Sequence, residues 1–465
     1  MTEANKSDYR VGDDGFWARA WVYPLVLAIA GGVLALVTAG PDRLGYAYLF
    51  GLFTTATFML GGLFLVLIQF LTASHWGVSS RRIAEVIMSG APIVALLALP
   101  FVGGVALGKI DIYDEWQSAA AHGAHGEEHG DSDSHSDGES ESEEGEHGML
   151  QLGASVAQAQ DHGDKQDDHG DAAAHEEGHA HTPQETALHH EIVAQKTGYL
   201  NTQGWTTRAI VYVVIWSLIA LAYFGWSRRQ DEDRDPKHTL RMQSLAAPSL
   251  ILFGGTLTFA AFDWMMSLEA AWFSTIYGVV IFAGSAVAIL AATILIGLSF
   301  YKRGLTGDAI TPVHFHDLAK LMFGFVCFWT YVSFSQWMLI WYAGIPEEAT
   351  WFARRWVGGW QFVAYLLIFG HFVAPFVLLI SRVQKLALRW LQVMCFWVIL
   401  MHIVDIYWFI LPQAGGFAVS PADIGALLFV GGVFFAYVFW QLGRVPLVPV
   451  GDPRLPKSLH HHQTH

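Results

Sequence analysis

Long runs of apolar residues alternate with short polar stretches along most of the 465-residue chain. A helix that crosses the hydrocarbon core of a bilayer needs about 20 such residues. Ten runs meet or approach this length, and we expect each to form a transmembrane helix. Their approximate bounds are 21–39, 46–73, 85–107, 207–226, 247–266, 271–300, 313–341, 356–380, 388–411 and 422–440. The pattern predicts an all-α polytopic membrane protein.

Composition supports this class and excludes others. Hydrophobic residues make up 53% of the chain and charged residues only 14%, whereas soluble domains are about a quarter charged. A soluble enzyme, a disordered scaffold and a nucleic-acid binder are therefore excluded. Cys327 and Cys395 both lie in apolar runs, and the sequence has no C-x-x-C-H haem attachment, iron–sulfur spacing or ATP-binding P-loop motif. We assign no catalytic residue, cofactor or metal to this chain.

The stretch 111–199 differs from the rest of the chain. It contains 22 acidic residues, 12 His and two Lys, a net charge of −20 that leaves the remainder at +5. With almost no apolar periodicity, it is expected to be a mobile, solvated insert. Its His residues would suit zinc, copper or nickel, but no ligand spacing recurs, so a simple spacer is the alternative. The C-terminal His cluster is assigned no role.

Basic residues predict the orientation. Eighteen Lys and Arg fall on the loops and ends of one side and seven on the other, with Lys320 inside the seventh run. The positive-inside rule then places both termini in the cytoplasm and the insert outside.

The predicted units are a leader with the first helix (1–45), half of a first bundle (46–110), the insert (111–199), the other half (200–270), a second bundle (271–411), and the last helix with a tail (412–465).

A weak internal repeat supports two four-helix bundles with flanking helices. The third run begins RRIAEVI from position 81 and the seventh HDLAKLM from position 316, which places Glu85 opposite Lys320. Asp263 in the fifth run and Asp405 in the ninth then occupy corresponding outer positions. Parallel repeats of this kind occur in transport proteins. Each unit would carry one titratable group near its cytoplasmic face and one near its outer face.

Charged and titratable side chains at membrane depth are costly and usually face the bundle interior. The candidates are Glu85, Asp263, His316, Asp317, Lys320, His371, His402 and Asp405. Helical spacing makes neighbours of Asp317 and Lys320, of His316 and Lys320, and of His402 and Asp405. A carboxylate beside an imidazole can relay protons, because His titrates near neutral pH.

Polar groups further along the seventh run would extend a proton path outward from Lys320 through ordered water. They are Tyr331, Ser333 and Ser335. The alternative interpretation is structural: Asp317 and Lys320 form an ion pair at the membrane edge, and His402 bonds a backbone carbonyl.

Haem b is a further option, but His371 would lie about 22 Å and His402 about 14 Å below the outer membrane edge. The unequal depths argue against a shared haem.

Two long motifs resemble the F subunit of alternative complex III. One comprises HDLAKLMFGF at 316–325 with FSQWMLIWYAGIPEE at 334–348, and the other is TFAAFDWMMSL at 258–268. The ten-run plan is similar along nearly the whole chain. The subunit belongs to the wider NrfD/PsrC-like membrane family, whose fold of two four-helix bundles plus flanking helices agrees with the repeat. The His-rich insert departs from the family pattern.

The resemblance implies a complex in the bacterial inner membrane that oxidises menaquinol and reduces a periplasmic cytochrome c or a terminal oxidase. Haem c and iron–sulfur clusters would reside in partner subunits, and an NrfD-like sister subunit is the usual candidate for the quinol site. The F-like subunit would then conduct protons and support assembly among lipids. Whether it binds menaquinol itself stays open. A stand-alone secondary transporter and an inert anchor for haem subunits are the alternatives.

Overall fold

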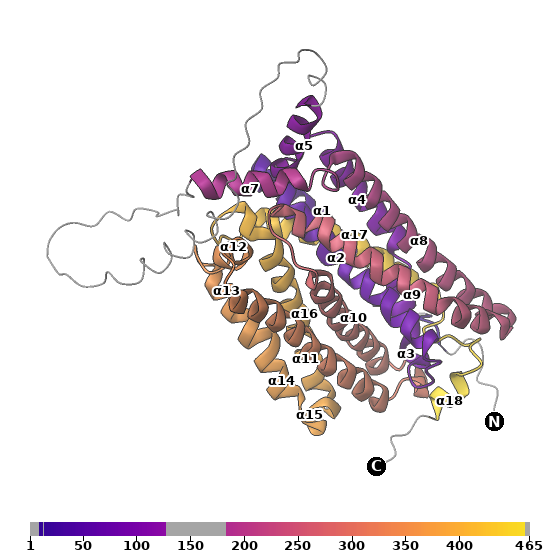
Figure 1. The fold of residues 1–465 in the computed structure, drawn as a ribbon. Helices are drawn as coiled ribbons and strands as arrows, with labels where there is room; N and C mark the ends of the chain where they lie inside the picture. The colour runs from indigo at the N-terminus through magenta and orange to yellow at the C-terminus, as the bar shows by residue number, and fades with distance from the viewer. Residues whose placement is uncertain (1–8, 13, 127–182, 461–465) are drawn as a thin grey trace, which may run out of the picture.

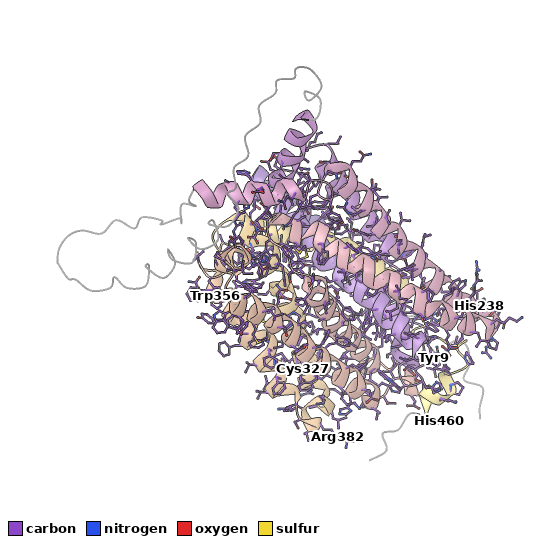
Figure 2. The ribbon with its side chains drawn as sticks, viewed as in Figure 1. Tyr9, His238, Cys327, Trp356, Arg382 and His460 are labelled. Carbon is purple, nitrogen blue, oxygen red and sulfur yellow. The ribbon has the colours of Figure 1, made fainter. Side chains whose placement is uncertain are left out.

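The computed structural model describes residues 9–12, 14–126 and 183–460, and every regular element in these residues is helical. The helices pack side by side in an elongated bundle (Figure 1). Helices α5 (Asp114–Gly126) and α7 (Pro183–Gln195) lie at one end, which we call the insert end. Tyr9 and His460 lie together at the opposite end, the tail end (Figure 2).

All ten predicted apolar runs fall on helices. Among the described residues, nine helical stretches are long and apolar enough to cross a membrane, and α1 (Val22–Thr38) is a shorter apolar helix of 17 residues. The others are α2 (Pro41–Leu71), α3 (Val78–Met88) with α4 (Ala91–Ala106), α8 (Thr202–Asp233), α9 (Lys237–Trp264), α10 (Tyr277–Lys302), α11 (Pro312–Ala343), α13 (Trp360–Leu366) with η3 (Leu367–Val373) and α14 (Ala374–Leu379), α16 (Leu388–Ile410) and α17 (Pro421–Leu442). The prediction of an all-helical, multi-pass membrane protein is confirmed at this level.

Helices α2 and α10 form the centre and are almost wholly buried. A Cβ at Gly61 of α2 would collide with the carbonyl oxygen of Ser285 on α10, so glycine is needed for this close approach. Similarly, a Cβ at Gly425 of α17 would lie 2.7 Å from the Gly31 carbonyl oxygen of α1. The outer helices α8, α9 and α11 leave many apolar side chains exposed, as expected of surfaces that face lipid.

Two of the predicted runs are not regular α-helices. The third is interrupted at Ser89 and Gly90, where Pro92 in the first turn of α4 lacks the N–H that a continuous helix would use. The eighth contains a π-helical segment, η3, between α13 and α14. Such wider turns often occur at functional sites, and η3 carries His371.

The boundaries predicted for the insert are wrong at both edges. Trp116 of α5 is fully buried and Val193 of α7 nearly so. The two helices are joined by an ion pair between Glu115 and His189 at 2.9 Å, and Lys196 donates to the carbonyl oxygen of Ala270 at 2.7 Å. The apolar spacing here was hidden by the acidic composition of the surrounding sequence. The central part of the predicted loop, 127–182, lies outside the described residues.

Candidate functional site: polar clusters inside the bundle

A polar cluster lies in the bundle interior where α2, α11, η3 and α16 meet. The indole nitrogen of Trp329 donates to Asp405 Oδ2 at 2.9 Å. The Trp329 indole also stacks on the His371 imidazole, with ring centroids 4.0 Å apart. Thr57 Oγ1 lies 2.8 Å from His402 Nε2. We call these five residues the inner cluster; His371, His402 and Asp405 are fully or almost fully buried.

Local backbone features make room for the inner cluster. The π-helical segment η3 places His371 against Trp329, and the Trp397 indole donates to the Gly370 carbonyl oxygen at 2.7 Å. On α10, Gly284 faces the His402 ring: a Cβ there would lie 3.1 Å from Nδ1. Any larger residue would crowd His402.

The inner cluster contains polar atoms with unused hydrogen-bonding capacity. Neither ring nitrogen of His371 has a partner among the described residues, and the same holds for His402 Nδ1. Asp405 forms no ion pair with another described residue, and its side chain accepts one hydrogen bond, from Trp329. Buried polar atoms in this state are unusual and call for water or a functional explanation. The cluster thus contains three side chains with groups that can bind protons.

The structure corrects the relative depths predicted for His371 and His402. Trp329 contacts both His371 and Asp405, and Asp405 is less than one helical turn from His402 on α16. The two histidines therefore lie at similar depth. The predicted difference was too large because helix α13 begins at Trp360, four residues later than the apolar run suggested. Two histidines at similar depth are compatible with a shared haem b, but the His371 ring is packed directly against the Trp329 indole.

The predicted candidate Glu85 belongs to an ionic network buried at the tail end. Its carboxylate lies 2.7 Å from Arg81 Nε and 3.2 Å from Arg82 Nη1, and Ser227 donates to it at 2.7 Å. Arg81 also pairs with Asp452 at 2.8 Å. The complete network consists of Arg81, Arg82, Glu85, Asp231, Asp452 and Arg454. It has three groups of each sign, so its formal charges balance.

The segment after α17 completes this tail-end network. Burial would raise the pKa of Asp452, but the guanidinium groups of Arg81 and Arg454 outweigh that effect and hold the pKa below its ordinary value. The two guanidinium groups also lie over the Phe70 ring, at 4.4 and 5.0 Å from its centroid. Such a closed network is strongly destabilised when one member is removed.

Asp317 and Lys320 form the predicted ion pair, at 2.6 Å. The Lys320 side chain is 52% exposed, so the pair lies at the surface of the bundle. His316 Nδ1 is 3.9 Å from Asp317 Oδ1. Nearby, Lys385 donates to the Leu379 carbonyl oxygen at 2.5 Å, and burial together with the charge of Lys320 lowers its pKa. This geometry fits the structural alternative and leaves the two residues apart from the inner cluster.

Asp263 is held by a counter-charge at the insert end. Arg208 of α8 binds it through two hydrogen bonds, Nε to Oδ2 and Nη2 to Oδ1, both 2.9 Å. Tyr212 donates to Oδ2 at 2.6 Å, and the Trp205 indole donates to the Asp263 carbonyl oxygen at 2.6 Å. The bidentate geometry and full burial of the carboxylate make this a strong structural pair.

The remaining predicted residues lie along α11. Tyr331 is 66% exposed on the outer face of the helix, and Ser333 and Ser335 are half-buried. The structure therefore does not bring Tyr331 together with the interior groups. The sequence predicted that all three extend a proton path outward from Lys320, but the side chain of Tyr331 faces away from the bundle interior.

Two further ionic sites were missed by sequence reasoning. Arg43 pairs with Asp423 at 2.7 Å near Tyr407. Arg355 is buried against the Trp351 ring at 3.6 Å and lies 3.5 Å from Glu269; burial lowers its pKa to about 10, against the opposing effect of Glu269. The charged residues of both sites lie next to the ends of predicted helices. The arginines among them were used to predict the orientation, but ion pairs between charged residues at different helix ends were not considered.

No known protein family and no curated protein matches the chain at a significant level. Among the described residues, no group of three or more His, Cys, Asp and Glu side chains is arranged to hold a metal ion. The fold and the buried polar clusters define a multi-pass membrane protein with titratable groups in its interior.

Proposed function

We propose that this chain is a membrane subunit of a quinol-oxidising electron-transfer complex of the alternative complex III type, and that it conducts protons. The observation that carries proton conduction is the buried carboxylate of Asp405, whose hydrogen-bond partner is the neutral indole of Trp329. A carboxylate at membrane depth without a counter-charge is costly unless it binds a proton. His371 and His402 provide further proton acceptors in the same cluster.

The proposed architecture has ten transmembrane helices, with two four-helix bundles formed as a parallel repeat. Helices α2, α3 with α4, α8 and α9 form one bundle, and α10, α11, α13 with α14, and α16 form the other. The positions of Asp263 and Asp405 towards the insert end of α9 and α16 support it. Their environments have diverged, because Asp263 is paired with Arg208 while Asp405 is not.

The redox chemistry is assigned to partner subunits. In this proposal, c-type cytochromes and an iron–sulfur subunit carry haem c and the clusters, and an NrfD-like sister subunit oxidises menaquinol. The two motifs around Asp263 and 316–348 support membership in such a complex. Purification of the native complex and identification of its subunits tests it: c-type cytochromes should co-purify. A chain that purifies alone and transports solute would favour a secondary transporter.

Proton conduction is tested in vesicles that contain the purified complex. We expect Asp405→Asn to lower the number of protons moved per electron, because the amide cannot bind and release a proton at this site. Lys320→Met, which removes a half-exposed charge, is the second variant and tests the path predicted from sequence. An unchanged proton ratio in a fully assembled Asp405→Asn complex would refute conduction through the inner cluster and favour an inert anchor.

The proposed location is the bacterial inner membrane with both termini in the cytoplasm. The test is cysteine labelling in cells, in a background with Cys327 replaced by Ser. Glu232→Cys at the tail end should react with membrane-impermeant reagent only after the cytoplasm is opened. Gln195→Cys at the insert end should react in intact spheroplasts. The reverse pattern would contradict the orientation.

A further inference from the structure

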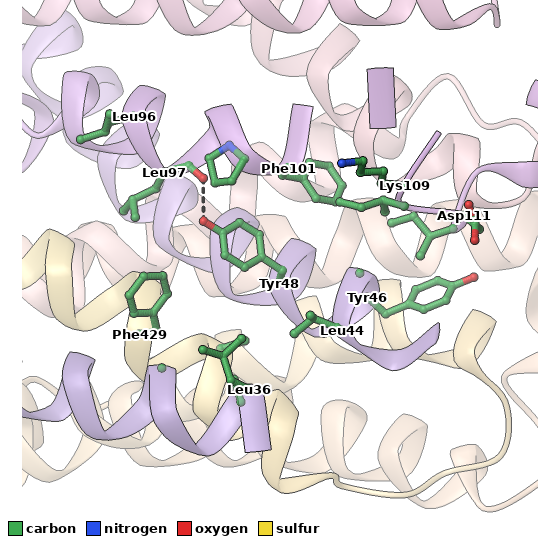
Figure 3. Close-up of a pocket in the computed structure, with 17 residues that line it drawn as sticks. Leu36, Leu44, Tyr46, Tyr48, Leu96, Leu97, Phe101, Lys109, Asp111 and Phe429 are labelled. Carbon is green, nitrogen blue, oxygen red and sulfur yellow. Dashed lines mark hydrogen bonds between the residues drawn. The ribbon is translucent and has the colours of Figure 1, made fainter. Parts of the chain in front are cut away.

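A groove at the insert half of the bundle runs between α1, α2, α4 and α17 (Figure 3). Its volume is about 750 Å³, within the range of small-molecule sites. Leu36, Leu97, Phe101 and Phe429 form much of its apolar wall. Lys109 and Asp111 lie towards one end of it (Figure 3).

The groove is positioned to be reached from the bilayer. Its lining residue Leu96 is 61% exposed and Leu36 is 74% exposed, and both lie on apolar helices that are expected to contact lipid. Lys109 and Asp111 follow α4 at the insert end, the level at which an apolar chain passes into the headgroup region. A molecule in the groove would thus have an apolar part within the membrane and a polar part at its edge.

The charges at the rim indicate what the polar part is. Both Lys109 and Asp111 are exposed, and neither takes part in an ion pair with another described residue. A headgroup with one anionic and one cationic group would complement both. The phosphate of phosphatidylethanolamine would accept from the Lys109 ammonium, and its own ammonium would donate to the Asp111 carboxylate.

The interior of the groove suits a hydrocarbon chain. Tyr48, the polar side chain on its wall near the middle of the groove, already donates to the Leu97 carbonyl oxygen at 2.8 Å (Figure 3). The hydroxyl hydrogen of Tyr48 is therefore not free for a carbonyl oxygen of a quinone ring at this depth, and such a ring would lose its hydrogen bonds to water. We propose that this groove is a specific binding site for phosphatidylethanolamine, with an acyl chain between α1 and α4 and the headgroup at Lys109 and Asp111.

The test is lipid binding to the purified full-length chain, measured by native mass spectrometry in mild detergent. Phosphatidylethanolamine is titrated against phosphatidylglycerol of the same acyl chains. We expect a single tight phosphatidylethanolamine site, weakened about fivefold by Lys109→Ala and by Asp111→Asn, the effect of losing roughly one headgroup contact. Both substitutions are at exposed positions, so the fold should be preserved.

A matched pair of variants on α4 tests the position of the chain. Leu96→Trp should fill the groove and abolish tight binding. Leu99→Trp, at a residue that is 58% exposed but does not line the groove, should leave it unchanged. Equal effects of the two variants would overturn the site. Equal affinity for phosphatidylglycerol with no effect of Asp111→Asn would overturn the headgroup assignment, and so would displacement of the lipid by menaquinone.

Discussion

Trp329 joins two titratable residues of different helices: its nitrogen donates to Asp405 at 2.9 Å while its ring stacks on His371 at 4.0 Å. Asp263, the corresponding carboxylate of the proposed repeat, is instead bound by the Arg208 guanidinium. The charge of a buried carboxylate beside a cation is balanced, whereas that of one beside a neutral donor is not. The two aspartates therefore differ in chemistry although they occupy similar positions along their helices.

Replacing Trp329 by Phe separates its two contacts. The ring can still stack on His371, but the hydrogen bond to Asp405 is lost, which should cost about 1–3 kcal/mol of stability. We expect proton movement per electron to fall in vesicles while the complex still assembles. Trp337→Phe, on the same helix and without a side-chain hydrogen bond in the described structure, is the control. Normal proton movement with Trp329→Phe would show that the indole nitrogen is dispensable.

Loss of Arg208 should affect stability more than function. Arg208→Leu leaves the Asp263 carboxylate buried without its counter-charge, and breaking a buried pair in this way costs about 3–5 kcal/mol. Thermal unfolding of the purified protein should show a clear drop in midpoint. The exposed Arg229→Leu, on the same helix as Arg208, should change it little. The double variant Arg208→Leu/Asp263→Leu should recover part of the loss; if it does not, packing rather than charge explains the effect.

Asp452 should make the fold sensitive to acid. Its pKa in the folded protein lies below the unfolded value of about 3.9. Its contribution to stability is therefore fully present above that pH and is lost as the pH falls through the folded pKa. We expect Asp452→Asn to lower the unfolding temperature at pH 7, with the difference from wild type shrinking below about pH 4. The exposed Asp308→Asn serves for comparison; a difference that did not depend on pH would exclude the ionic explanation.

Deletion of residues 127–182 should leave the bundle intact, because the described helices on both sides of that stretch already pack on the body of the protein. Size-exclusion chromatography and thermal unfolding would compare the deletion with wild type. Trp116→Ala in α5 should instead destabilise by about 3–5 kcal/mol, since that side chain is fully buried. Failure of the deletion variant to fold or assemble would mean that the removed residues contribute a contact.

The helices could be predicted from sequence because the required length of an apolar run is imposed by the bilayer. The ends of α1 were located within one residue, and so was the end of the interrupted run at 85–107, but its helical stretch begins seven residues earlier, at Val78. The π-helical turn at His371 could not be predicted, since it depends on packing against Trp329 and Trp397. That local change in backbone, together with the later start of α13, explains the error in depth.

The sequence showed which charged residues lie in the apolar runs, but not which of them have a partner of opposite charge. Glu85, Asp263, Lys320 and Asp405 looked equivalent in sequence, yet the first two are balanced by arginines and Lys320 is half exposed. The arginines beside Glu85 lie one helical turn away, at Arg81 and Arg82, and this local pattern could have been recognised. The Arg208 partner of Asp263 is 55 residues away, and no local pattern encodes that pairing.

The members of the tail-end network are synthesised at widely separated times. Arg81 and Arg82 leave the ribosome with only Glu85 close to them in the chain, and the carboxylate of Asp231 follows 149 residues after Arg82. Asp452, the last acidic member, emerges 371 residues after Arg81. The network can therefore close only when nearly the whole chain has been synthesised. A chain truncated before Asp452 would lack Arg454 as well, so the remaining charges would still balance, but Arg81 would have lost one of its two carboxylate partners.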